Sequence, residues 1–179
     1  MADPVEYVCS ALDALGISYE HYSHPPVFTS EEAAEHWAEI PATRVKNLFL
    51  RNKKGDRHYL VILGVGKEAN LKHLVKVIGD DRLSFASPER LMTYLGLTPG
   101  SVSPFGLLND ARQRVTVIVD DDLRRADRLI FHPNINTASL TISLADFERF
   151  LASRGNPVRW IRVQNPVSGD NDRTLNPEP

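Results

Sequence analysis

Two apolar runs joined by a short polar turn constrain the fold of this chain more than any other feature. Residues 45–51 and 57–65 are strand-length apolar segments, and between them lies the turn Asn52-Lys53-Lys54-Gly55-Asp56. Turn-forming residues between two such segments predict a β-hairpin. The apolar side chains that we expect to share one face of this hairpin are Leu48, Leu50, Leu60 and Ile62.

Helix and strand signals alternate through the rest of the chain. Three helices are predicted by their capping residues, which are Asn70, Ser87 (followed by Pro88) and Ser143. Further helices are expected over residues 4–15 and from Thr29 to before Pro41. A loop is expected over residues 98–109. Strands are expected over residues 17–22, 115–119, 129–131, 139–142 and 158–163. Because hairpins mix with strand–helix units, we expect an α/β fold in which helices flank a mixed sheet.

The length of 179 residues fits one domain with its own hydrophobic core. We expect this domain to span residues 1–163, and the polar residues 164–179 to form a flexible tail. The single cysteine, Cys9, allows no intrachain disulfide, and no run of about 18 apolar residues could cross a membrane. With no signal-peptide pattern at the N-terminus, these features predict a cytoplasmic protein.

Positive charge is concentrated in one segment of an acidic chain. Residues 44–76 hold nine lysines and arginines against two acidic residues, whereas the whole chain has a net charge of −2. Such a segment can bind a polyanion locally while the protein stays soluble. A solvated face of the hairpin and the next helix is an equally good interpretation of the charge alone.

Several common motifs of catalysis and binding are missing. The sequence contains no G-x-S-x-G, no G-x-x-x-x-G-K-[ST] and no H-E-x-x-H. Its six histidines have no tight metal-type spacing, so we expect no metal site.

Three local features remain as candidates, each with a plainer alternative. Lys46-Asn47 opens an apolar strand, where the ammonium could hold a phosphate or polarise a carbonyl, or simply reach solvent. The loop over residues 100–106 could bind an anion through backbone N–H groups, or be a surface turn. His132 leaves a strand and could contact a ligand, or make a structural hydrogen bond.

Taken in order, these features resemble the YbaK/prolyl-tRNA-synthetase-associated family of trans-editing domains. The resemblance covers about residues 4–163, and the size of the chain and its H-P-P-V-F-T segment are similar to the PrdX-type branch, which removes alanine mischarged on proline tRNA. The segments that carry it are His24-Pro25-Pro26-Val27-Phe28-Thr29, Lys46-Asn47-Leu48-Phe49-Leu50, the G-x-x-x-P loop Gly100-Ser101-Val102-Ser103-Pro104-Phe105-Gly106, Phe131-His132-Pro133-Asn134 and Thr141-Ile142-Ser143.

The resemblance implies a freestanding aminoacyl-tRNA deacylase with a mixed, partly curled sheet and no metal or organic cofactor. It implies that Lys46 meets the terminal phosphate or the substrate carbonyl, that Asn47 fixes the ribose or ester, and that His132 lines the pocket. Backbone donors of the loop from Gly100 would face the aminoacyl group. Residues expected to bind that group are Val27, Phe28, Ser101, Ser103, Pro104 and Phe105, with Leu48 and Ile62 as further walls. Those expected to bind tRNA are Arg44, Lys46, Lys67, Lys72 and Lys76.

An editing role is physically reasonable for a chain without a strong nucleophile. A synthetase site for proline cannot strongly reject alanine, because missing methylenes are worth only about 1–3 kcal/mol. The ester is already activated, so positioned water and oxyanion donors can suffice. Partners would be the mischarged acceptor end of tRNA(Pro) and prolyl-tRNA synthetase. The alternatives are a non-catalytic tRNA- or DNA-binding module, a synthetase-associated regulatory module, and a small-molecule hydrolase that does not use tRNA.

Overall fold

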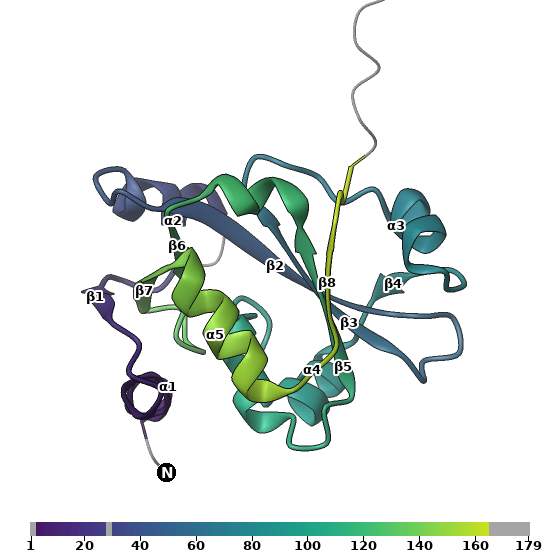
Figure 1. The fold of residues 1–179 in the computed structure, drawn as a ribbon, viewed down its shortest axis with the longest axis horizontal. Coiled ribbons are helices and arrows are strands. Elements are labelled where there is room, and N and C mark those ends of the chain that lie inside the picture. The colour runs from purple at the N-terminus through teal and green to yellow at the C-terminus, as the bar shows by residue number, and fades with distance from the viewer. Residues whose placement is uncertain (1–2, 28–29, 165–179) are drawn as a thin grey trace, which may run out of the picture.

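A computed structural model describes residues 3–27 and 30–164 of the chain (Figure 1). Its helices are α1 (Pro4–Ala14), α2 (Ser30–Trp37), α3 (Leu71–Ile78), α4 (Pro88–Leu95) and α5 (Leu144–Arg154), with short 3-10 helices η1 (Pro104–Asn109) and η2 (Asp121–Arg125). Its strands are β1 (Tyr19–Ser23), β2 (Thr43–Arg51), β3 (His58–Gly64), β4 (Ser84–Phe85), β5 (Val115–Asp120), β6 (Arg128–Phe131), β7 (Ala138–Ser143) and β8 (Val158–Ile161). The predicted tail lies outside the described residues except for Gln164.

The predicted capping residues begin their helices as expected. Asn70 accepts a hydrogen bond from the backbone nitrogen of His73 at 3.0 Å, and Ser143 accepts one from that of Asp146 at 3.1 Å. Each bond satisfies a backbone donor that has no partner inside the helix. Three helix starts could therefore be read from local sequence alone.

The strands form one mixed sheet in the order β1-β7-β6-β2-β3-β5-β8, with β4 paired to β2. Strand β2 is antiparallel to β3 and parallel to β6, while β3, β5 and β8 run parallel to one another. The mixed α/β architecture predicted from the sequence is confirmed. No helix among the described residues is long and apolar enough to span a membrane.

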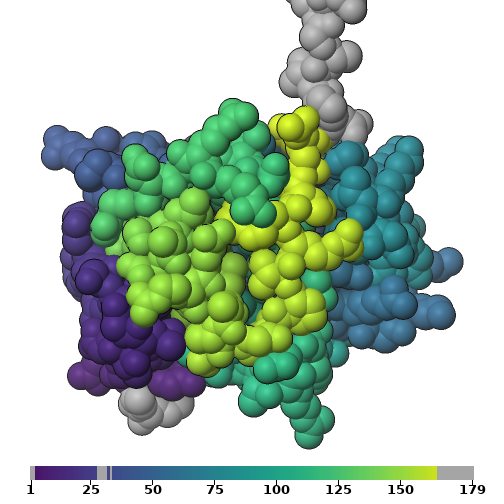
Figure 2. Space-filling view, in the orientation of Figure 1, coloured from purple at the N-terminus to yellow at the C-terminus, as the bar shows by residue number. Residues whose placement is uncertain are grey.

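Helices cover both faces of the sheet. One face packs against α1, α4, η1 and α5 and forms the largest hydrophobic cluster, while α3 packs against the other face through Leu74. Figures 1 and 2 show α5 in front of the sheet, with α1 beside it. Arg149 of α5 holds these two helices together by donating to the backbone oxygen of Leu15 at 2.6 Å.

The predicted face of the hairpin is wrong. Leu48 pairs with Val61, so it shares a face with that residue rather than with Leu60 or Ile62. The latter two point to the opposite face, toward the largest cluster. Turn length decides which residues pair, and a shift of one residue moves every side chain of a strand to the other face.

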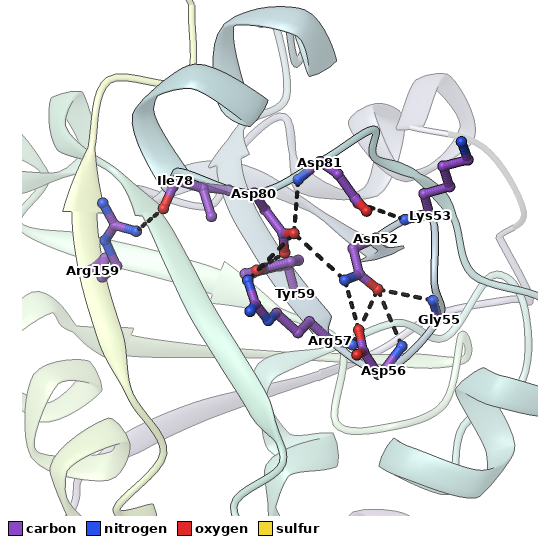
Figure 3. A network of polar contacts seen from close by, with 10 residues as sticks. All are labelled: Asn52, Lys53, Gly55, Asp56, Arg57, Tyr59, Ile78, Asp80, Asp81 and Arg159. Atoms are coloured by element: carbon purple, nitrogen blue, oxygen red, sulfur yellow. Dashed lines mark hydrogen bonds and ion pairs between the residues drawn. The ribbon is translucent and has the colours of Figure 1, made fainter.

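A buried asparagine in the turn sets this register (Figure 3). The Oδ1 atom of Asn52 accepts hydrogen bonds from the backbone nitrogens of Gly55, Asp56 and Arg57, at 2.9, 3.1 and 3.2 Å. Its Nδ2 atom donates to Asp56 at 2.7 Å. Beyond the turn, the hydroxyl of Tyr59 donates to Asp80, so the segment after α3 is tied to the same hairpin.

Candidate functional site

Strands β2 and β6 pair only briefly and then separate. Their parallel register joins Thr43 to Leu129 and Arg44 to Ile130. Lys46 and His132 each lie two residues beyond the last pair, so they flank the point of separation. Because parallel partners point to the same face and side chains alternate along a strand, both are expected on the face of Arg44 and Ile130. Ile130 packs there against Trp37 of α2.

His132 is held so that one ring nitrogen is free to accept a proton. Its Nδ1 atom lies 3.0 Å from the backbone oxygen of Ala138. A carbonyl oxygen can only accept, so Nδ1 carries the hydrogen of the neutral ring and Nε2 carries the lone pair. Burial lowers the pKa of His132 below its ordinary value; the bond to Ala138 opposes this shift, and repulsion from His24, when that ring is protonated, adds to it. Near pH 7 His132 is therefore a neutral acceptor.

Asn47 points to the opposite face, where it meets the glycine-containing loop. Its Nδ2 atom donates to the backbone oxygen of Val102 at 3.1 Å. Its Oδ1 atom is buried and has no hydrogen-bond partner among the described residues. Asn47 and Gly100 line a cavity of about 220 Å³. The other residues that line it are Leu48, Phe49, Phe85, Ala86, Pro88, Leu91, Pro99 and Val102.

The rest of the loop is anchored in the hydrophobic core. Ser103 accepts from the backbone nitrogen of Phe105 at 3.2 Å and so caps η1. The Phe105 ring is fully buried, with its centroid 5.8 Å from that of Phe131 and 5.2 Å from that of Phe150. The loop thus contacts β2 through Val102 and β6 through Phe105. Pro104 is also buried.

The segment after β1 lies along the β6–β7 loop. Val27 is buried against Trp37 and Ile130, and its backbone nitrogen donates to Asn136 at 3.1 Å. Phe28 lies outside the described residues. Ser101 is buried, and its backbone nitrogen donates to the oxygen of Thr98 at 3.1 Å.

The basic residues predicted to bind tRNA differ in whether their charged groups are already bonded within the protein or exposed. Lys67 forms ion pairs with Asp120, at 2.5 Å, and with Asp122. The guanidinium of Arg44 donates to the backbone oxygen of Trp37 at 3.2 Å. In contrast, Lys72 and Lys76 are exposed on α3, four residues apart and so on one side of the helix.

The predicted site residues therefore form two groups at one opening of the sheet. Lys46 and His132 flank the point where β2 and β6 separate. Asn47 and Gly100 line the cavity of about 220 Å³, and Lys46 and His132 do not line it. Sequence reasoning missed Trp37, whose ring packs against that of His132, and Ser139, whose hydroxyl accepts a hydrogen bond from Trp37. The one signal for Ser139 was a hydroxyl within the apolar strand 138–142.

Fold and site together define a small α/β domain whose candidate site lies where two parallel strands separate, a common location for ligands in such sheets. Residues 24–150 match the family described as aminoacyl-tRNA editing domain. "Prolyl-tRNA editing protein ProX" of Acetoanaerobium sticklandii is 42% identical over 161 residues, covering 90% of this chain and 98% of that protein. "Prolyl-tRNA synthetase associated domain-containing protein 1" of Mus musculus is 32% identical over 148 residues, covering 80% and 86%.

A solved structure agrees with this fold. The crystal structure of hypothetical protein APE2540 superimposes with a TM-score of 0.70 at 21% identity, covering 91% of this chain and all of that one. The chain belongs to the aminoacyl-tRNA editing domain family, which confirms the resemblance predicted from its motifs. It is an aminoacyl-tRNA deacylase.

Proposed function

We propose that this protein acts in trans on tRNA(Pro) and hydrolyses the ester that joins a wrongly attached alanine to it. The observation that carries the proposal is the small cavity that Asn47 and Gly100 line together, since the resemblance assigns Asn47 to the ribose or ester and the loop from Gly100 to the aminoacyl group. The 42% identity to a protein named for prolyl-tRNA editing supports the choice of tRNA. Translation takes place in the cytoplasm, where we place the protein.

The size of the cavity supports a short amino-acid side chain. Its volume of about 220 Å³ lies below the range of about 300–1,000 Å³ that is typical of drug-sized ligands. Its walls are mostly apolar, with Leu48, Phe49 and Leu91 among them. The methyl group of alanine suits such apolar walls.

The chemistry needs only water and well-placed polar groups. A water molecule adds to the ester carbonyl, the bond between the carbonyl carbon and the ribose oxygen breaks, and a proton passes to that oxygen. The products are free alanine and uncharged tRNA. The lone pair on Nε2 of neutral His132 can accept a hydrogen bond from the water or from the substrate. The ammonium of Lys46 can hold the terminal phosphate.

Cationic residues would hold the acceptor end. Arg44 lies beside Lys46 on β2, and Lys72 and Lys76 add two exposed charges on α3. Contacts of this kind to phosphates give most of the affinity for nucleic acid and are weakened by salt. Prolyl-tRNA synthetase is a second proposed partner, because the names of several relatives contain the words "prolyl-tRNA synthetase associated domain".

A deacylation panel tests the proposal. Purified protein is mixed with tRNA(Pro) that carries alanine, cysteine, serine or proline, and amino-acid release is followed. Alanine should be released fastest, and Lys46→Ala should lower kcat/KM about 10- to 100-fold, because a hydrogen bond to a charged group is worth about 1.5–3 kcal/mol. Lys54→Ala, which removes an exposed charge from the hairpin turn, serves as the matched control.

Two outcomes would overturn the proposal. Salt-sensitive binding of tRNA(Pro) without release of any amino acid would identify a non-catalytic binding module. Hydrolysis of free amino-acid esters at a rate that added tRNA does not change would identify a small-molecule hydrolase.

A further inference from the structure

One buried hydroxyl connects two rings that pack against His132. Ser139 of β7 is fully buried. Its Oγ atom lies 2.9 Å from the indole Nε1 of Trp37 and 2.9 Å from Nε2 of His24. These three residues come from α2, β7 and the segment after β1, so the contact joins three separate parts of the chain.

The direction of each hydrogen bond follows from what each atom can do. The indole N–H of Trp37 can only donate, so Ser139 accepts from it. Nδ1 of His24 lies 2.8 Å from the backbone oxygen of Pro25, which can only accept, so Nδ1 carries the hydrogen of the neutral ring. Nε2 of His24 is then an acceptor, and it receives the single hydrogen of Ser139. Every polar atom in this series of hydrogen bonds, from the indole of Trp37 to the backbone oxygen of Pro25, is thus paired.

His132 packs against both of the rings that Ser139 holds. Its ring centroid is 5.9 Å from that of His24, with the planes inclined by 59°, and 5.6 Å from that of Trp37, inclined by 44°. Ala138, the neighbour of Ser139, accepts the hydrogen bond from Nδ1 of His132. Two consecutive residues of β7 therefore hold His132, Ala138 directly and Ser139 through the rings.

Other ionisable groups lie around this arrangement. Those that face it from the neighbouring elements are Tyr22, His36 and Glu39 beside the cavity that His24 and Trp37 also line, and Arg44 and Lys46 on β2. Although imidazole rings gather here, no three histidine, cysteine, aspartate or glutamate residues in the described parts of the chain are placed to hold a metal ion.

We propose that Ser139 is a positioning residue for the deacylation reaction, and that it acts by fixing the rings of Trp37 and His24 against His132. We call this arrangement, in which Ser139 fixes Trp37 and His24 against His132, the clamp. The inference rests on the proposed function for its kinetic consequences, but the clamp itself can be measured without substrate. Without the hydroxyl, Trp37 keeps an indole N–H with no acceptor, and His24 loses its donor. Both rings are then free to move, and water can reach His132.

The first experiment measures the clamp by NMR on the full-length protein. The imidazole of His132 is titrated by following its ring resonances, which are assigned with a His132→Gln variant. Since burial is the main cause that lowers its pKa, admitting water should raise that pKa toward the ordinary value in Ser139→Ala. Trp37→Phe, which keeps an aromatic ring but removes the donor, should raise it by a smaller amount.

The matched control is a second buried hydroxyl on the same strand. Thr141 of β7 is buried and accepts a hydrogen bond from Arg128 at 2.8 Å. Thr141→Val removes that hydroxyl with little change of shape. It should leave the pKa of His132 unchanged, even if both variants lose similar amounts of stability.

The second experiment measures the kinetic consequence. In Ser139→Ala, kcat for Ala-tRNA(Pro) should fall about tenfold with KM nearly unchanged, because the acceptor is displaced while the binding contacts remain. The acidic limb of the pH–kcat profile should move to higher pH together with the pKa of His132. A purely structural role would lower the active fraction and leave that limb where it was.

The outcomes separate the two proposals. An unchanged pKa of His132 in Ser139→Ala, or an equal shift in Thr141→Val, would overturn the clamp. A shifted pKa of His132 in a protein that releases no amino acid from any tRNA would support the clamp and overturn the proposed function. A shifted pKa with unchanged kcat would show that the clamp holds His132 but does not serve the reaction, which would overturn the positioning role.

Discussion

Asn47 donates a hydrogen bond to the backbone oxygen of Val102, and this contact leaves the amide oxygen of Asn47 without a partner among the described residues. An unsatisfied buried acceptor costs about 1–3 kcal/mol. A bound donor would remove that cost. The α-ammonium group of an aminoacyl ester is a donor of this kind, and a charged donor gives a bond about twice as strong as a neutral one.

We predict that Asn47 distinguishes the ammonium of the substrate from a neutral group. Wild-type protein should hydrolyse alanyl-tRNA(Pro) faster than lactyl-tRNA(Pro), in which a hydroxyl replaces the ammonium. Asn47→Ala should reduce this preference about tenfold or more, since a hydrogen bond to a charged group is worth about 1.5–3 kcal/mol. The measurement is kcat/KM for both substrates with both proteins. Equal losses on both would mean that Asn47 only supports the loop at Val102.

Exposed and ion-paired lysines should contribute differently to tRNA binding. Replacing Lys72 and Lys76 together by glutamine should reduce the steepness of log K against log salt by about 1.4–1.8, because each phosphate contact contributes about 0.7–0.9. Lys67→Gln should leave that slope unchanged and instead destabilise the fold, because Asp120 is fully buried beside it. Binding titrations of tRNA(Pro) at several salt concentrations decide this. An unchanged slope in the double variant would contradict α3 as a contact surface.

The protein should lose stability on acidification because of a buried histidine. Burial, with further contributions from the charges of Arg90, Arg114 and Arg51, lowers the pKa of His58 from 6.5 to about 4. The unfolded chain thus binds more protons between these values, so the free energy of unfolding falls as the pH falls from 6.5 to 4. At about 1.4 kcal/mol per pKa unit, this loss amounts to about 3 kcal/mol.

Urea unfolding at several pH values measures this loss. The variant His58→Gln keeps an acceptor for Arg90, which donates to Nε2 of His58 at 3.0 Å, but it does not titrate. It should therefore show a flatter dependence of stability on pH over this range. The same slope in wild type and variant would assign the acid sensitivity to other groups.

A methyl group at Gly106 should destabilise the loop that carries Gly100. A Cβ atom there would lie 2.7 Å from the side chain of Leu97 and 3.2 Å from the backbone oxygen of Leu95. Overpacking of this kind costs about 1–3 kcal/mol, so Gly106→Ala should lower the melting temperature clearly. Gly66→Ala is the control, because a Cβ atom at Gly66 would meet no atom within 4 Å. Equal melting temperatures for both variants would contradict this packing.

Features decided by neighbouring residues could be predicted from the sequence. Asn70 and Ser143 cap their helices because a cap is a contact over three residues. The face of Leu60 could not be predicted, because it depends on the register that buried Asn52 sets within the turn. The two-residue strand β4 was missed, since so short a segment has no period to detect.

Candidate site residues could be proposed from the sequence, but their arrangement could not. Lys46, Asn47, Gly100 and His132 could be chosen from motifs alone. Their division into two groups depends on where β2 and β6 separate, which is a property of long-range pairing. No role for Ser139 could be predicted from its hydroxyl alone, because its hydrogen-bond partners lie 102 and 115 positions away along the chain.

The alternation of side chains along β2 has a consequence for what can enter. Lys46 and Asn47 are adjacent in the chain but point to opposite sides of the sheet. A molecule that contacts both must therefore pass around β2, at the point where β6 no longer pairs with it. A thin, unpaired end of a polynucleotide can make that passage, whereas a double helix is too wide. If Lys46 and Asn47 both contact the substrate, as proposed, the geometry of one strand selects a single-stranded end, with no residue dedicated to rejecting duplexes.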